Sequence, residues 1–406
     1  GSAPARSGGR RRPARAVQHS TRKVFSVTVR PISRTAVFAT TALFLGGTLV
    51  ACSSPSGDAA GSVSAAQDAS TAQSAADFGG IDALVQAAQA EGQLNVVALP
   101  EDWANYGAII SGFEEKYDIT VNSASPDASS AEEIQAADNL KGQDTAPDVF
   151  DLGTAVALEN TAKFAPYKVE TWDDIPAENK HPDGLWVNNY SGIMSLGYDS
   201  DKLPEPAALE DLLGADYRGA VAINGDPTQA GAAFAAVGWI AALNGGGVDD
   251  FGPGIDFVAD LRQAGNFLPL DPTPATIASG ETPAVLDWSF NNVAVANDVP
   301  SWKTVVLPGA AYVSFYNEAI NADAPNPAAA RLWQEWIFSD EAQALFLEGN
   351  AVPVRIDSLT EAGSVDENLI EGATFGTKGA DWVSPDEAQT AAANTVLAER
   401  WAAAVK

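Results

Sequence analysis

Apolar positions recur along the chain at two spacings, and together they predict alternating helices and strands. Ile81, Leu84 and Ala88 repeat with the period of an amphipathic helix. The apolar run 94–99 that follows has the length of a buried strand and stops at Pro100. The same succession recurs up to the last residues, and this pattern predicts an α/β fold with a largely parallel sheet.

The predicted elements span an ordered body of roughly 330 residues, more than one core usually holds, so we expect two lobes. Strands are predicted at 94–99, 119–121, 149–152, 193–198, 221–224, 284–288 and 312–319. Helices are predicted at 81–91, 106–117, 228–243, 253–263 and 327–338, and further helices open at Ser130, Thr154, Ser339 and Ser384. Ser130 with Glu133 forms a capping-box pattern, and Ser384-Pro385 with Glu387 is a second helix start. Residues 356–383 carry no clear pattern.

The N-terminal region has the layout of a secretory signal. Arg30 and Arg34 precede an apolar run of about 16 residues that ends at Cys52, shorter than the roughly 20 residues of a membrane-spanning helix. Leu49-Val50-Ala51-Cys52 resembles the lipobox of bacterial lipoproteins, in which the cysteine carries lipid; an incidental cysteine is the alternative. We therefore expect residues 1–51 to be removed. Residues 52–77, rich in Ser, Ala, Gly and Asp, should be a flexible tether that holds the protein at the outer face of the membrane.

Charge changes the picture once the leader is set aside. The chain has 23 basic and 53 acidic residues, and nine of the basic residues but none of the acidic ones precede Cys52. The remainder repels nucleic acid and anionic lipid and concentrates cations, although solubility alone explains such a surface equally well.

The scarcity of reactive side chains excludes several chemistries. Cys52 is the single cysteine, so no disulfide, thiolate nucleophile or zinc–sulfur site is expected. Of the two histidines, His19 lies in the leader and His181 in a polar turn, which excludes a histidine-rich metal site. Nucleotide-binding glycine motifs are missing. We expect no cofactor and no enzymatic activity, with a carboxylate-dependent hydrolase as the remaining catalytic alternative.

Three stretches resemble the extracellular solute-binding proteins of bacterial ABC importers, in particular the group of ferric-ion and spermidine/putrescine binders. They are residues 92–121, the strand 193–199 that ends in Tyr198-Asp199, and the helix pair 326–355. The last begins with Asn326-Pro327 and ends with Pro353-Val354-Arg355. The resemblance implies a two-lobed periplasmic-binding-protein-like type II fold with crossing hinge strands. Lobe 1 would hold residues 78–190 and 308–406, lobe 2 would hold 191–307, and the ligand would bind in the cleft.

Candidate ligand-binding residues follow from the strand ends, where open α/β sheets hold their ligands. They are Asp102, Trp103, Asp151, Thr154, Tyr190, Asp226, Thr228, Asp287, Trp288, Asn291 and Tyr316. Carboxylates beside aromatic rings suit a cationic amine, and the resemblance to polyamine binders points the same way. Asp102 and Asp226 could instead cap helices, and Trp288 could belong to the core.

Other ligands and functions stay open at this stage. The predicted helix start near Thr228 suits a small anion such as an aminoalkylphosphonate. Ferric ion is disfavoured because the iron binders of the family carry paired tyrosines near the position of Phe290-Asn291. The leading prediction is a monomeric, lipid-anchored binding protein that delivers an organic solute, preferably a polyamine or related amine, to ABC permease subunits. A tethered sensor shares the fold and remains an alternative.

Overall fold

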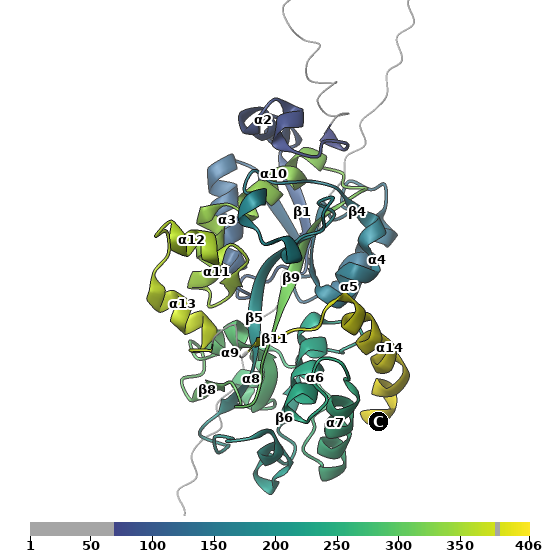
Figure 1. Ribbon diagram of the computed structural model, residues 1–406, viewed down its shortest axis with the longest axis vertical. Coiled ribbons are helices and arrows are strands. Elements are labelled where there is room, and N and C mark those ends of the chain that lie inside the picture. Colours follow the sequence, from purple (N-terminus) through teal and green to yellow (C-terminus); the bar gives the residue numbers. More distant parts are fainter. Residues whose placement is uncertain (1–68, 378–381) are drawn as a thin grey trace, which may run out of the picture. The chain divides into compact units, whose positions relative to one another are not determined.

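A computed structural model describes residues 69–377 and 382–406, which all belong to the compact unit formed by residues 58–406. The predicted leader, Cys52 and tether residues 52–68 lie outside the described residues. Within them, two long strands, β5 (Val187–Asp199) and β9 (Ala311–Asn321), run side by side through the middle of the molecule (Figure 1). They pair antiparallel from Val187 opposite Glu318 to Ile193 opposite Val313, with a register irregularity between Asn188 and Ser191.

Shorter strands extend β5 and β9 into each lobe. In lobe 1 they pair with β3 (Val149–Gly153), β4 (Phe164–Ala165) and β10 (Val352–Pro353). In lobe 2, β5 pairs with β7 (Ala284–Trp288) and β8 (Trp302–Val305), and β6 (Val221–Ile223) joins β7. A separate pair in lobe 1 consists of β1 (Gln93–Val97) and β2 (Thr120–Ala124). Both expected lobes are therefore built on two shared strands.

Helices cover the sheets of each lobe. Lobe 1 carries α2 (Ile81–Glu91), α3 (Tyr106–Tyr117), α4 (Ser130–Leu140), α5 (Thr154–Glu159), α10 (Pro327–Ile337), α11 (Asp340–Glu348), α12 (Ile356–Glu361) and α13 (Glu367–Thr374). Lobe 2 carries α6 (Gly231–Leu243), α7 (Gly252–Ala264), α8 (Pro274–Ser279) and α9 (Ser289–Val295). None of the helices in the described ranges is both long and apolar enough to cross a bilayer.

The expectation of a largely parallel sheet is wrong. Among the described strands, only the pairs β1–β2, β6–β7 and the pair of β9 with β11 (Trp382–Val383) are parallel. The remaining pairs all involve β5 or β9 and are antiparallel: β5 leads the chain into lobe 2, β9 leads it back, and each runs against its partner strands in these pairs.

The Asn326-Pro327 motif has a structural role at the start of α10. The backbone N–H and side-chain amide of Asn326 donate to the buried Asp148 carboxylate at 2.7 and 3.0 Å. Glu91 accepts the N–H groups of Ala328 and Ala329 at 3.0 and 2.7 Å, so a carboxylate satisfies free donors of the first turn. The motif thereby joins α2, β3 and α10 in lobe 1.

The described end of the expected tether is folded rather than flexible. Ala69, Ala72 and Ala75 are buried. The guanidinium of Arg331, itself 1 % exposed, donates to the carbonyl oxygens of Ser70 and Ala72 at 2.9 and 2.7 Å. Small alanine side chains allow this close packing. An alanine-rich composition is equally typical of a flexible linker, so composition alone could not predict that the segment is folded.

The C-terminal helix α14 (Glu387–Ala404) also departs from expectation, because it packs mainly on lobe 2. Trp401 lies edge-on to Phe267, with ring centroids 6.5 Å apart, and Arg400 forms an ion pair with Asp256 of α7. The helix starts after Asp386 rather than at Ser384, because the Asp386 carboxylate caps it by accepting the Gln389 N–H. Before it, β11 (Trp382–Val383) adds to the edge of β9.

Candidate functional site

A cleft of about 1050 Å³ lies between the two lobes. Lobe 1 contributes the loop after β1, the first turn of α4 and the end of β3. Lobe 2 contributes the loop after β6, the start of α6, the end of β7 and residues 271–274. Strand ends and helix starts of both lobes thus converge on one cavity, as the strand-end prediction required.

On the lobe 1 side, the cleft is built around Asp151 of β3. Its backbone N–H donates to Oε2 of Glu133 at 3.2 Å, and its Oδ2 accepts the hydroxyl of Tyr190 at 2.8 Å. The indole N–H of Trp103 donates to the same Tyr190 hydroxyl at 2.7 Å. A chain of hydrogen bonds therefore links the half-buried Trp103 to the carboxyl of Asp151.

The first turn of α4 places Glu133 in this group, and the predicted cap there is wrong by one residue. Ser129 and Glu132 form the capping box, with the Ser129 N–H donating to Glu132 at 2.8 Å. Ser130 instead accepts the Gly153 N–H at 3.0 Å, and the Glu133 side chain turns inward to β3. The sequence pattern fits a capping box at either serine, and packing of the helix against β3 selects the pair that begins at Ser129.

On the lobe 2 side, Asp287 at the end of β7 is held by three donors. The side-chain amides of Asn224 and Asn291 donate to its Oδ2 at 2.9 and 3.0 Å. Its Oδ1 accepts the backbone N–H of Trp288 at 2.7 Å. A carboxylate has about four acceptor positions, so these neutral donors fix its orientation and leave acceptor capacity toward the cleft.

Burial raises the pKa of the carboxyl groups at the cleft floor. Burial raises the pKa of Asp287 to about 6, against the opposing effect of its Asn224, Trp288 and Asn291 donors. The pKa of Asp151 is raised by burial, against the opposing effect of the Tyr190 hydroxyl. Burial and the neighbouring charge of Asp151 raise the pKa of Glu133 well above its usual range. Such groups favour a cation as neighbour, because it offsets the cost of their desolvation.

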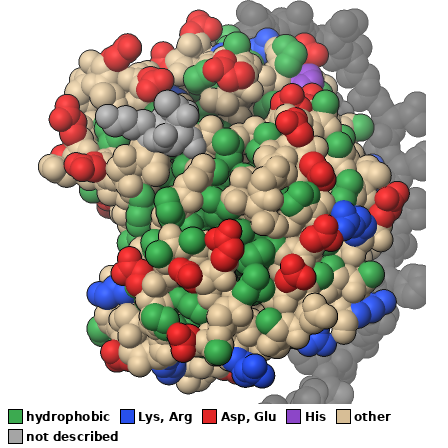
Figure 2. All heavy atoms as spheres, turned by 60° about the horizontal axis from the view of Figure 1, so that its bottom comes forward, with side chains coloured by type: hydrophobic (Ala, Val, Ile, Leu, Met, Phe, Trp, Pro, Cys, Tyr) green, Lys and Arg blue, Asp and Glu red, His purple; other side chains and the backbone are tan. Residues whose placement is uncertain are grey.

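The charge of the whole lining has one sign. In the described part of the chain, eleven lining residues are acidic and none is Lys, Arg or His. The acidic ones are Glu101, Asp102, Asp127, Glu132, Glu133, Asp151, Asp226, Asp271, Asp287, Asp298 and Glu348. Acidic side chains also outnumber basic ones on the face shown in Figure 2. The cleft therefore attracts cations and repels unaccompanied anions.

The structure brings most of the predicted site residues to the cleft. Those that line it are Asp102, Trp103, Asp151, Asp226, Asp287, Asn291 and Tyr316. Tyr190 is fully buried behind Asp151, and its ring stacks on that of Tyr316 with centroids 5.3 Å apart. Thr154, Thr228 and Trp288 line a smaller pocket of about 190 Å³ instead.

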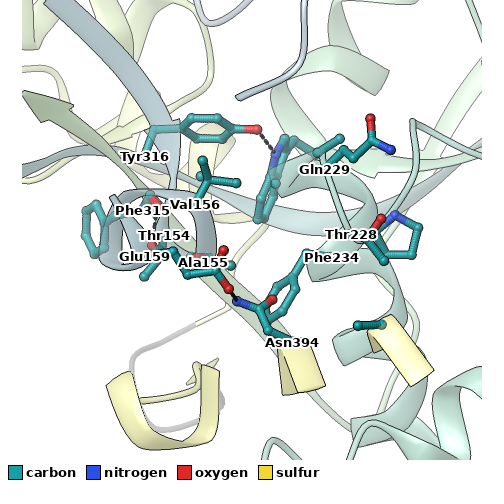
Figure 3. A pocket seen from close by; sticks show the side chains of 17 residues that line it. Thr154, Ala155, Val156, Glu159, Thr228, Gln229, Phe234, Phe315, Tyr316 and Asn394 are labelled. Carbon is teal, nitrogen blue, oxygen red and sulfur yellow. Dashed lines mark hydrogen bonds between the residues drawn. The ribbon is translucent and has the colours of Figure 1, made fainter. Parts of the chain in front are cut away.

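That smaller pocket lies among α5, the start of α6, β9 and α14 (Figure 3). In Figure 3, Asn394 of α14 points to Glu159 of α5, and its amide donates to that carboxylate at 2.7 Å. The hydroxyl of Thr154 donates to the Phe315 carbonyl oxygen at 2.9 Å. These contacts give Thr154 a structural role between β9 and α5, away from the cleft.

Two further candidates are engaged with their neighbours. The Asp226 carboxylate accepts the backbone N–H and the hydroxyl of Thr228 at 2.8 and 2.5 Å, which stabilises the turn before α6. Trp288 is 1 % exposed and donates its indole N–H to the Tyr316 hydroxyl at 3.2 Å, so it packs in the core. Of the predicted Asp287-Trp288 pair, only the carboxylate lines the cleft.

Sequence reasoning missed Glu133 and Asn224. Glu133 was assigned to a helix cap, and a single sequence does not show that Glu132 takes the capping role instead. Asn224 directly follows β6, and this strand-end position was the available signal. Within the described ranges, no group of three or more His, Cys, Asp or Glu side chains is arranged to hold a metal ion.

Solved structures with this fold bind different ligands. The chain is similar to AfuA of Actinobacillus pleuropneumoniae, a periplasmic binding protein with bound fructose-6-phosphate (TM-score 0.59, 16% identity, covering 77% of this chain and 98% of that one). It is also similar to a periplasmic thiamin binding protein (0.58, 18%, 77% and 96%). A third is the spermidine/putrescine substrate-binding protein PotD of Streptococcus pneumoniae (0.53, 12%, 77% and 99%). At these identities the likeness establishes the fold alone.

No curated protein sequence matches the chain. A sequence model of one family does: it is described as a bacterial extracellular solute-binding protein and matches residues 146–384, more than half of the chain. The matched range includes both crossing strands and the Asp151 and Asp287 sides of the cleft. The chain therefore belongs to the bacterial extracellular solute-binding proteins.

Proposed function

We propose that this protein captures a small organic cation, an amine such as a polyamine, in the cleft between its lobes. The observation that carries the proposal is the lining, which holds eleven acidic residues and no basic one in the described chain. An amine would form charge-assisted hydrogen bonds with carboxylates such as Asp151 and Asp287. The raised pKa values of these groups support this role, because a bound cation stabilises their ionised form.

We further propose that the protein is anchored through lipid at Cys52 and delivers its ligand, as a monomer, to the permease subunits of an ABC importer. Solute-binding proteins of this family bind rather than transform their ligands, and they act outside the cytoplasm. Hinge closure of two lobes on shared strands is the usual means of burying such a ligand.

A small anion is the weaker candidate. The expected anion site at the start of α6 has the Asp226 carboxylate in front of it, and the helix begins three residues later than predicted, at Gly231. A carboxylate at that position repels an anion that carries no compensating ammonium group.

Thermal unfolding with a ligand panel tests the proposal. The panel comprises putrescine, spermidine, thiamine, an aminoalkylphosphonate, ferric ion, inorganic phosphate and sulfate. A ligand present at 100 times its Kd stabilises the folded state by about 2.7 kcal/mol, equivalent to a rise in Tm of roughly 5 °C. We expect such a rise with amines. A rise with phosphate or sulfate alone would overturn the proposal.

A further inference from the structure

The aromatic rings at the cleft lining and directly behind it pack against one another. Trp103 contacts Phe290 and Tyr316 edge to face, with centroid distances of 5.4 and 5.6 Å. The face of Tyr190 is covered by Tyr316 at 5.3 Å and by Phe346 at 4.6 Å. A cation would need an open ring face within about 6 Å of the centroid. Mutual packing removes most of these faces.

The low exposure of these rings confirms that neighbouring side chains cover their faces. Tyr190 is 0 % exposed, Phe290 1 % and Tyr316 6 %, and of the four rings only Trp103 is partly exposed. The Trp103 indole N–H is already donated to the Tyr190 hydroxyl. An aromatic cage, the arrangement that binds quaternary ammonium ions, therefore cannot form from these side chains in the arrangement described.

Carboxylate groups of both lobes line the cleft instead. Asp287 lines the cleft with its orientation fixed by two amides and one backbone N–H. Asp151 lines it from the opposite lobe: its Oδ2 accepts the Tyr190 hydroxyl, and its Oδ1 is buried without a hydrogen-bond donor among the described residues. Oxygen acceptors of this kind recognise N–H groups directionally, and a shell of methyl groups offers them no donor.

Building on the proposed cation capture, we propose that the cleft selects ligands whose cationic nitrogen carries N–H bonds and discriminates against quaternary ammonium ions. Asp151 on lobe 1 and Asp287 on lobe 2 are the residues that accept these N–H groups. Primary and secondary ammonium groups and guanidinium groups meet the requirement. A fully methylated nitrogen has the same charge but leaves the buried carboxylates unpaired, and this is costly.

Isothermal titration calorimetry with matched ligand pairs tests the selection. Putrescine is compared with its hexamethyl bis-quaternary analogue, which has the same chain length and charge, and spermidine with its permethylated counterpart. We expect each amine to bind at least about tenfold more tightly than its methylated partner, because the methylated ligand loses at least one charge-assisted hydrogen bond. Equal or tighter binding of the methylated ligands would overturn the selection while leaving cation capture intact. Failure of every cation to bind, methylated or not, would overturn both.

A pair of variants identifies the group responsible. Asp151→Asn keeps an oxygen for the Tyr190 hydroxyl, so the fold should be retained. We expect it to weaken amine binding by about tenfold or more and to narrow the difference between amine and methylated analogue. Asp271→Asn removes the same charge from an exposed position of the lining and should change both affinities about equally and by less than about threefold. Identical effects of the two variants would assign the selection to general charge and contradict direct recognition.

Discussion

Acidification should weaken the binding of a cationic ligand, and Asp287 allows the effect to be calculated. Burial raises the pKa of this carboxyl to about 6 in the free protein, and a bound cation should lower the pKa so that the carboxyl stays ionised over the whole range studied. The bound state thus requires the ionised form, which is present above the pKa of the free protein and is lost as the pH falls through it. Between pH 8 and pH 5 the affinity should fall by about tenfold through this group alone.

Asp151 acts in the same direction, because burial raises its pKa as well. The tenfold decrease is therefore a lower bound for the whole cleft. Titration calorimetry of putrescine from pH 5 to pH 8 measures the affinity. Repeating it at pH 6 in buffers of different ionisation enthalpy counts the protons released, and Asp287 should contribute about half a proton.

The variant Asp287→Asn should flatten part of this pH dependence, because its side chain carries no proton to release in this range. Affinity that stays constant from pH 8 to pH 5, or rises on acidification, would refute the reasoning. Proton uptake on binding at pH 6 would contradict it equally, because it would mean that the ligand favours the neutral carboxyl.

Three further predictions concern the scaffold. Gly153→Ala would place a Cβ only 2.7 Å from the Cα of Gly231, which belongs to the other lobe. We expect this clash to oppose the close contact of the two lobes by about 1–3 kcal/mol. Ligand affinity, measured by calorimetry, should then fall by roughly 5- to 150-fold. Burial raises the pKa of Asp148 from 3.8 to about 7 and that of Glu335 from 4.5 to about 7. At pH values between the unfolded and the folded pKa, the folded state binds more protons than the unfolded state. Urea denaturation should therefore show greater ligand-free stability at pH 5 than at pH 8, by about 2.7 kcal/mol for Asp148. Trp401→Ala should lower the free energy of unfolding by about 3 kcal/mol, because it leaves a cavity under α14.

Each of these predictions has a control and a contrary result. Gly372→Ala meets no atom closer than 3.9 Å and should leave affinity unchanged; equal effects of the two glycine variants would rule out a lobe contact. Asp148→Asn should reduce the gain in stability at pH 5, and an unaltered pH profile would remove Asp148 from the explanation. Glu399→Ala changes an exposed position of the same helix as Trp401 and should cost less than about 0.5 kcal/mol. A similar loss in both α14 variants would show that Trp401 packing is not the cause.

Local sequence patterns predicted the individual elements well. The helix 106–117 and the strand 284–288 have the predicted bounds, because periodicity, turn residues and tertiary packing agree there. The helix 228–243 starts later, at Gly231, because Asp226 and Thr228 form a turn with each other first. Strand direction was not predictable from pattern, since an apolar run has the same appearance in both directions.

The candidate site shows where a single sequence reaches its limit. Asp151, predicted on its strand, and Asp287, predicted at a strand end, both line the cleft. The sequence pattern could not show that Trp288 packs in the core, because an aromatic residue at a strand end can face either the core or the cleft. Glu133 was assigned to a cap through a spacing that Ser129 and Glu132 satisfy equally well. Which of two equivalent spacings is used depends on long-range packing, here of α4 on β3.

The most direct test of cation capture is a crystal structure with the amine that produces the largest rise in Tm. The account predicts the ligand in the cleft between the lobes, with a ligand nitrogen about 2.7–3.0 Å from a carboxylate oxygen of Asp151 or Asp287. An amine bound elsewhere, or in the cleft without a carboxylate of either residue in hydrogen-bond range, would contradict it.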